Sequence, residues 1–266
     1  MREAVLRVRA LCLTSFKAIA VSAVFLGGAV LLDPVTPGSL VSSANAQDGK
    51  AKQDKRETRR TPALRNKVYE RLAEAQTLAE AKDYVGAAAI LNDMISEDGK
   101  RALNSYELAN VYNLHAFLSY AKEDYPQSLR YYEQVIAQPD IPLAMEINTR
   151  FTIAQLYFVQ EKWQQGIDAL LMWFEMNEKP NAGAYVLLAQ GYYQVKRYDL
   201  ALDNVETAIA MHEGEGKLPK EQWYNLARFL YFDKEDFDSA LDVLNTLIIY
   251  YPKKQYWVQA SHLYGE

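Results

Sequence analysis

The sequence predicts an all-α fold, a solenoid of stacked helix pairs, from three observations. First, one amphipathic phrase recurs, in which an aromatic residue is followed by a small residue after three positions and by apolar residues after seven and ten. These offsets share one face of an α-helix. Second, the phrases begin 41, 38, 35 and 39 residues apart, a spacing typical of helical repeat proteins. Third, no segment alternates as a strand would. The five phrases begin at Tyr84, Tyr125, Trp163, Tyr198 and Phe237.

The first 46 residues are organised like a secretory signal peptide. A basic start precedes an apolar run, residues 18–32, and a polar stretch then ends in Ala44-Asn45-Ala46. We expect cleavage before Gln47, a periplasmic location and no stable membrane insertion of the mature chain. The alternative, a membrane anchor, is disfavoured because this apolar run is shorter than the roughly 20 residues that span a bilayer. Cys12 is the only cysteine and lies in this segment, so the mature chain cannot use disulfides or thiolate chemistry.

Charge is distributed unevenly along the rest of the chain. Residues 48–67 contain eight basic and three acidic side chains, whereas residues 68–266 contain 17 basic and 29 acidic ones. We expect residues 47–61 to be a disordered basic linker, because this segment is highly charged and lacks aromatic residues. The acidic body repels phosphate groups, which argues against nucleic acid as the ligand.

Helical structure is expected from Thr61-Pro62, because threonine caps a helix well and proline is tolerated at its first position. Each helix pair then turns at two charged residues that precede the aromatic, and the longer connections contain proline or glycine. The expected solenoid covers residues 62–266. Its helix pairs are expected at about 68–96, 106–138, 146–178, 182–212 and 220–252, followed by a partial unit at 254–266.

The helix pairs resemble the tetratricopeptide repeat (TPR), a family of helix–turn–helix units 34 residues long. Its first helix, helix A, carries a small residue at position 8 and an aromatic residue at position 11. Repeat five contains one extra residue between its small residue and Phe237. The resemblance implies a right-handed α-solenoid that holds a protein partner. The aromatic position is matched by Tyr157, Tyr192 and Tyr231. The small position is matched by Ala75, Ala116, Ala154, Ala189 and Ala227.

A narrower resemblance concerns the two ends of the repeat region. Residues 59–76 and 255–266 are similar to secreted TPR proteins that accompany TonB–ExbB–ExbD systems. This resemblance implies an accessory role in energised outer-membrane transport, with an envelope protein or peptide segment as partner. Two other functions stay open: a cell-envelope assembly or division accessory that self-associates, and a polysaccharide-export accessory that binds glycan.

The last segment reads as helix A of a sixth repeat. Its expected inward residues are Trp257, Ser261 and Tyr264, and no helix B follows. A bare stacking face exposes apolar surface, so we expect either a piece of a longer protein or a final helix that acts as the cap. Self-association through this C-terminal end is a further expectation.

Enzymatic residue patterns are absent from the sequence. His115, His212 and His262 are far apart, without metal-ligand spacing or a triad pattern, and no glycine loop could hold a phosphate. We expect no enzyme activity, no metal and no cofactor.

Partner binding is expected on helix A instead. In the TPR family the concave face is built from helix A positions near 2, 5, 9 and 12, and here those positions are rich in rings and amides. Rings supply contact area to a peptide, and amides pair with its N–H and C=O groups. The alternative for each ring is a place in the core between repeats. The candidate residues are Asn113, Phe117, Tyr120, Phe151, Gln155, Phe158, Val186, Gln190, Tyr193, Tyr224 and Arg228.

Overall fold

The computed structural model describes residues 62–96 and 102–264, and within these ranges every regular element is a helix. The expected all-α solenoid is confirmed, but its first helix begins at Asn66 and not directly after Thr61-Pro62 as expected. The expected signal peptide and basic linker lie outside the described residues, as do residues 265–266 of the expected partial repeat. In the part of the chain that is described, no helix is both long and apolar enough to cross a membrane.

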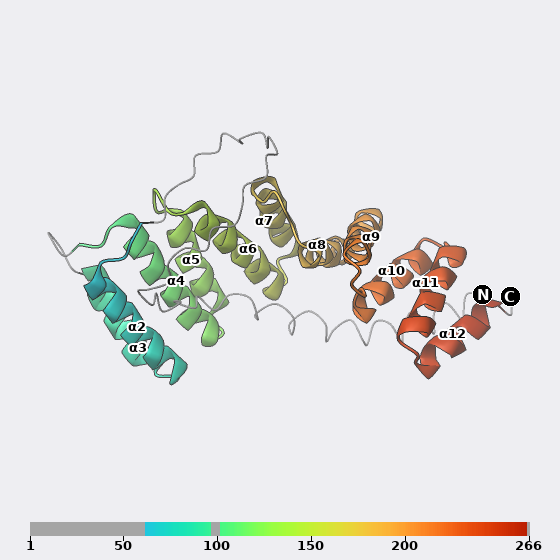
Figure 1. Cartoon of the computed structure of the whole chain (residues 1–266), viewed down its shortest axis with the longest axis horizontal. Helices are drawn as coiled ribbons and strands as arrows, with labels where there is room; N and C mark the ends of the chain where they lie inside the picture. The colour runs from blue at the N-terminus through green and yellow to red at the C-terminus, as the bar shows by residue number, and fades with distance from the viewer. Residues whose placement is uncertain (1–61, 97–101, 265–266) are drawn as a thin grey trace, which may run out of the picture.

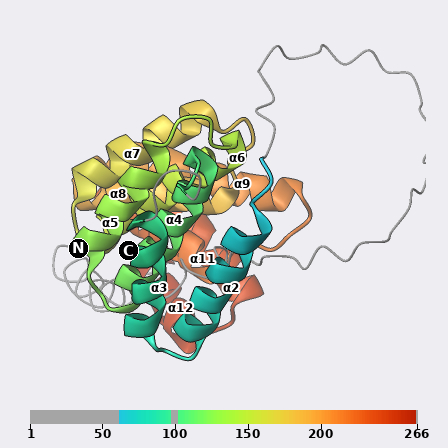
Figure 2. The same cartoon turned by 90° about the vertical axis from the view of Figure 1, so that its left-hand side faces the viewer.

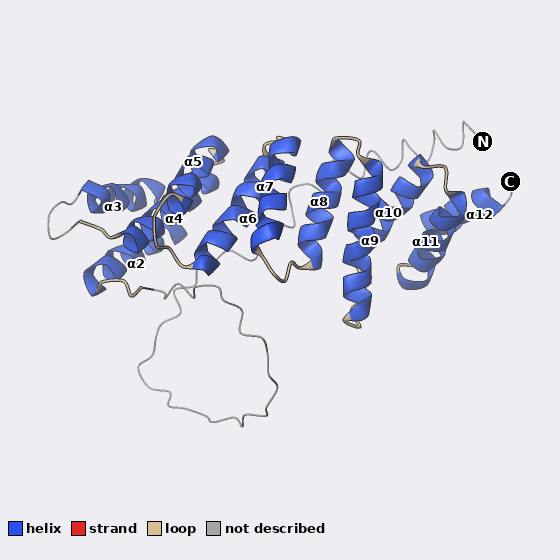
Figure 3. Ribbon diagram, turned by 90° about the horizontal axis from the view of Figure 1, so that it is seen from above, coloured by secondary structure: helices blue, strands red, loops and turns tan. Residues whose placement is uncertain are grey.

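The helices stack as consecutive antiparallel pairs in one row, from α2 at one end to α12 at the other (Figures 1 and 3). Viewed from the α2 end of the row, the first helices lie in front of the later ones, which remain visible beside them (Figure 2). The A helices are α2 (Asn66–Glu80), α4 (Ser105–Ala121), α6 (Leu143–Val159), α8 (Ala182–Gln194), α10 (Glu221–Asp233) and α12 (Lys254–Tyr264). The B helices are α3 (Tyr84–Ser96), α5 (Tyr125–Ile136), α7 (Trp163–Met176), α9 (Tyr198–Gly214) and α11 (Phe237–Tyr250).

All five turns from an A helix to its B helix have the same geometry. In the first turn Lys82 has a left-handed backbone, its N–H donates to the Ala79 carbonyl at 2.9 Å, and the next N–H donates to the Leu78 carbonyl at 2.8 Å. This is a Schellman motif, which pairs the last carbonyls of the helix. The left-handed residue of each turn therefore marks a common reference point for the register of its A helix. These residues are Lys82, Glu123, Glu161, Lys196 and Glu235.

A small residue seven positions before that reference point lets the helices pack closely in repeats one to four. Each of these alanines is completely buried. In repeat five the same place belongs to Arg228, which is also buried, and Ala227 lies one position earlier. The sequence register placed Ala227 at the small position, and the structure corrects it by one residue. The four alanines are Ala75, Ala116, Ala154 and Ala189.

The last helix is also rotated relative to expectation. Tyr256 is completely buried and Ala260 is buried, whereas Trp257 is 60 % exposed, Tyr264 is 66 % exposed and Ser261 is exposed. The expected inward set is therefore wrong by one residue. The cause is the docking of Tyr256 on α10, where its hydroxyl donates to Glu221 Oε1 at 2.5 Å.

Candidate partner-binding face

Seven of the eleven candidate residues are exposed or half-buried, and we call them the helix A face. Phe117 on α4 is 45 % exposed. Gln155 on α6 and Gln190 on α8 occupy the equivalent place in the next two repeats and are half-buried. These three side chains recur at one position of successive A helices. The other members of the face are Asn113, Tyr120, Phe151 and Tyr193.

Phe158 and Val186 are instead buried in the core between repeats. The reason is visible at two glycines beside the Phe158 ring. A Cβ atom added to Gly166 would lie 3.0 Å from the ring, and one added to Gly191 would lie 2.7 Å from it. The ring therefore fills the space that both glycines leave open, and it offers almost no area to a partner.

Tyr224 and Arg228 of repeat five are buried and hydrogen-bonded. The Tyr224 hydroxyl donates to Glu213 Oε1 at 2.8 Å. The Arg228 guanidinium donates to Asn225 Oδ1 at 3.1 Å and to Gln259 of α12, and it lies over the Tyr256 ring at 5.8 Å. These side chains join α10 to its neighbours, and partner contact would require their release.

Counting back from the turn shows which residues of repeat five occupy the places of Asn113, Phe117 and Tyr120. They are Asn225, Phe229 and Phe232, which the sequence reasoning missed. The signal was present in the charged turn before Phe237, because a count from that turn gives the register that the structure has. Phe229 is buried and meets Tyr193 edge to face, with ring centroids 5.5 Å apart. The helix A face is thus closed by ring packing at repeat five.

An aromatic ring near the end of the A helix stabilises the turn in repeats two to five. In four repeats this ring contacts the aromatic residue that starts helix B, five positions later, with centroids 5.6 to 6.2 Å apart. Such aromatic pairs contribute about 0.5–1.5 kcal/mol beyond their buried area. Tyr120 and Tyr193 therefore stabilise their turns as well as bordering the face. The pairs are Tyr120–Tyr125, Phe158–Trp163, Tyr193–Tyr198 and Phe232–Phe237.

The helix A face is uncharged. Burial, followed by the nearby Tyr125 and Glu123, raises the pKa of Tyr120, so its hydroxyl stays protonated. His115, on another side of α4, stacks on Tyr131 with centroids 4.7 Å apart, and burial and Lys122 lower its pKa to about 4. That imidazole is neutral at pH 7. Among the described residues no three metal-binding side chains come together. The face offers rings and amides for contact.

Comparison with solved structures identifies the fold. YrrB, described as a TPR protein with an unusual peptide-binding site, is similar with a TM-score of 0.56 and 17 % identity over 74 % of this chain and 94 % of that one. A TPR protein from Parabacteroides merdae has a TM-score of 0.55 and 15 % identity over 74 % and 72 % of the two chains. MamA from Desulfovibrio magneticus has a TM-score of 0.54 and 11 % identity over 70 % and 96 %. No family model and no curated protein sequence matches the chain. The chain has the TPR fold.

Proposed function

We propose that the protein is a non-catalytic scaffold that binds an extended or helical segment of a protein partner along the helix A face. The observation that supports this proposal most is the row formed by Phe117, Gln155 and Gln190, one side chain per repeat at the same helix position. A ring followed by amides provides contact area and then hydrogen bonds to a peptide backbone. YrrB, whose fold is similar, is described as having a peptide-binding site.

The experiment compares affinity capture by the wild type and by a triple variant, Phe117→Ala with Gln155→Ala and Gln190→Ala. We expect proteins captured by the wild type to be lost with the variant, because three neighbouring contacts disappear together. Circular dichroism should show unchanged helical content, since these side chains are not in the core. The matched control is Met172→Ala on the exposed side of α7, which should capture the same proteins as the wild type. Equal capture by the triple variant would contradict the proposal.

The place of action proposed here is the periplasm, supported by the signal-peptide pattern of residues 1–46. A partner in the cell envelope, in a TonB-type transport system, is supported by the resemblance of residues 59–76 and 255–266. Cell fractionation with mass spectrometry of the mature N-terminus tests the location. A mature chain that begins at Gln47 in the periplasmic fraction is the expected result, and an uncleaved cytoplasmic chain would contradict it.

Self-association is a second candidate function, favoured by the exposed apolar side chains of α12. Trp257, Val258 and Tyr264 are all exposed on that helix. Exposed apolar patches of this kind mark interaction surfaces. Light scattering of the mature chain should then show a dimer or larger species that Trp257→Ser converts to a monomer. A monomeric wild type at high concentration would remove this candidate.

A further inference from the structure

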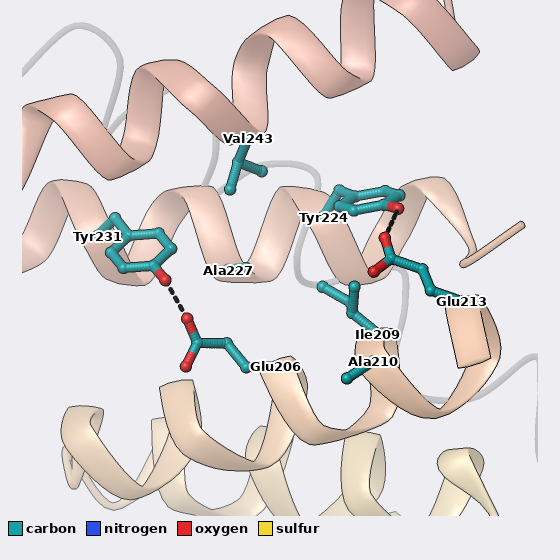
Figure 4. Close-up of a pocket in the computed structure, with 8 residues that line it drawn as sticks. All are labelled: Glu206, Ile209, Ala210, Glu213, Tyr224, Ala227, Tyr231 and Val243. Atoms are coloured by element: carbon teal, nitrogen blue, oxygen red, sulfur yellow. Dashed lines mark hydrogen bonds between the residues drawn. The ribbon is translucent and has the colours of Figure 1, made fainter.

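A hollow of about 220 Å³ lies between the B helices α9 and α11, with α10 as its floor (Figure 4). Its walls are apolar, made by Ile209, Ala210, Ala227 and Val243. The α10 residues that line the hollow, Tyr224, Ala227 and Tyr231, lie on one side of the helix. Asn225, Phe229 and Phe232, which correspond to the helix A face, lie on another side. The hollow is therefore separate from the face proposed above.

A small residue at one position of α10 leaves this hollow open. Eight positions before the turn, repeats two, three and four carry the buried, bulky side chains of His115, Ile153 and Leu188. In repeat five that position holds Ala227. Because protein interiors are normally close-packed, an alanine where the other repeats place a bulky side chain leaves space. Tyr224 and Tyr231 lie at the two ends of the opening, eleven and four positions before the turn, where repeat four carries Tyr185 and Tyr192.

Two tyrosine–glutamate pairs form the rim. The Tyr224 hydroxyl donates to Glu213 Oε1 at 2.8 Å, and the Tyr231 hydroxyl donates to Glu206 Oε1. The second oxygen of each carboxylate has no hydrogen-bond partner among the described residues. Burial and then the adjacent carboxylate raise the pKa of both tyrosines, so each stays a hydrogen-bond donor. The two carboxylates are thus held in place with one free oxygen each.

The distance between the two rim carboxylates indicates which ligand would fit them. Glu206 and Glu213 are seven residues apart on α9, which corresponds to roughly 10 Å along the helix axis. A helix with two basic residues at i and i+7 repeats this spacing, and residue i+3 or i+4 then lies between them on the same side. The side chain at that position would meet the apolar walls of the hollow.

We propose that the hollow binds a helical segment of a cationic protein partner. Lysine or arginine side chains at i and i+7 pair with Glu206 and Glu213, and an aliphatic side chain between them enters the hollow beside Ala227. Charge complementarity supports this occupant, because Asp203 continues the acidic row on α9 and the nearby Lys234 is already paired with Asp199 at 2.6 Å. A small amine could satisfy one carboxylate but would not reach both and fill the hollow.

The test measures binding of the full chain to a fluorescent alanine-rich peptide of about 18 residues, long enough for an isolated helix to form. The peptide carries lysines at i and i+7 and leucine at i+4. We expect saturable binding by fluorescence polarisation that weakens with salt. Glu206→Gln and Glu213→Gln should each raise Kd roughly three- to fivefold, as expected for rim charges. A peptide with serine in place of the leucine should bind more than about tenfold more weakly.

The decisive variant is Ala227→Leu, which places in repeat five the side chain that Leu188 provides in repeat four. It keeps every charge of the rim and fills the hollow, so we expect more than about a tenfold loss of peptide affinity. Its thermal midpoint should equal or exceed that of the wild type. This result would exclude unfolding as the cause of the lost peptide affinity. Glu133→Gln is the matched charge control, because Glu133 occupies the place of Glu206 two repeats earlier, above the filled position of Ile153.

Three results would overturn the proposal: no binding of the lysine peptide, unchanged affinity of Ala227→Leu, or a loss in Glu133→Gln equal to that in Glu206→Gln. The Phe117→Ala, Gln155→Ala and Gln190→Ala variant should bind the peptide like the wild type. Failure at the hollow would therefore leave the function proposed for the helix A face untouched.

Discussion

Repeats two to four and repeat five share one turn geometry but differ in the two helix A residues that stand eight and seven positions before the turn. In the earlier repeats a bulky buried residue precedes a buried alanine, whereas repeat five has the alanine first and then an arginine. This reversal opens a hollow toward α9 and α11 and sends a guanidinium group toward α12. Two residues are therefore enough to change what a repeat contacts. The pairs compared are His115-Ala116, Ile153-Ala154 and Leu188-Ala189 against Ala227-Arg228.

The strongest test transfers the arginine into repeat four. Ala189→Arg should destabilise the protein by more than about 3 kcal/mol, because the alanine is completely buried and the new charge has no partner there. Urea unfolding followed by circular dichroism measures the change. The neighbouring control Gln190→Arg, at a half-buried position, should cost less than about 1 kcal/mol. Equal losses of unfolding free energy in the two variants would contradict the claim that repeat four has no room for an arginine at this position.

The reciprocal change removes the arginine from repeat five. Arg228→Ala should cost about 2 kcal/mol, because the hydrogen bonds to Gln259 and Asn225 are lost. The effect should concentrate in α12, where hydrogen exchange is expected to accelerate more than in α8. Arg130→Ala is the control, since that exposed side chain bonds only Gln127 of its own helix within residues 62–96 and 102–264. Protection of α12 that stays at the wild-type level would show that Arg228 does not hold it.

A glycine of repeat four provides the next test. Gly191→Ala should destabilise by about 1–2 kcal/mol, because the added methyl group would lie 2.7 Å from the Phe158 ring and 2.9 Å from Ile167. At the equivalent place repeat five carries Leu230, which is completely buried. Gly183→Ala is the matched control, since Gly183 is exposed and its nearest neighbour would be an Asn181 side-chain atom at 3.1 Å. Thermal unfolding should show a lower midpoint for Gly191→Ala alone.

The smallest expected effect concerns the turns, which the repeats share. Lys196→Gly and Glu235→Gly should each stabilise the fold by about 0.5 kcal/mol, because glycine adopts φ near 60° without a Cβ clash. The greater freedom of glycine in the unfolded chain opposes folding and offsets part of this gain. Equal gains in both repeats, measured by urea unfolding, would confirm that the turns match where the helices differ. Opposite signs would show that the turns differ as well.

Much of the fold could be predicted because its signals are local. The aromatic that starts each B helix and the charged pair before it marked all five turns. The helical periodicity of the small and apolar residues that follow the aromatic identified the paired helices. The left-handed backbone at Glu123 and Glu161 could not be predicted, since such positions usually hold glycine. The register of repeat five was missed because the count started from Ala227 when the turn defines the register.

The candidate site was predictable only in part, because helix periodicity shows which residues share a face but not how deeply each one lies. Phe117 and Phe158 both belong to the predicted face, yet one is exposed and the other is buried. The difference comes from Gly166 and Gly191, which lie on other helices and admit the Phe158 ring. Contacts between helices of this kind depend on the tertiary arrangement.

Site-specific photo-crosslinking in cells tests the helix A face most directly. A photoreactive amino acid is placed at Phe117, Gln155 or Gln190, and in separate controls at the exposed positions Val85 and Met172 of B helices. We predict that all three positions of the face yield the same partner adduct and that the two controls yield none. Adducts that form at Val85 and Met172 but not at the helix A face would contradict the proposed function.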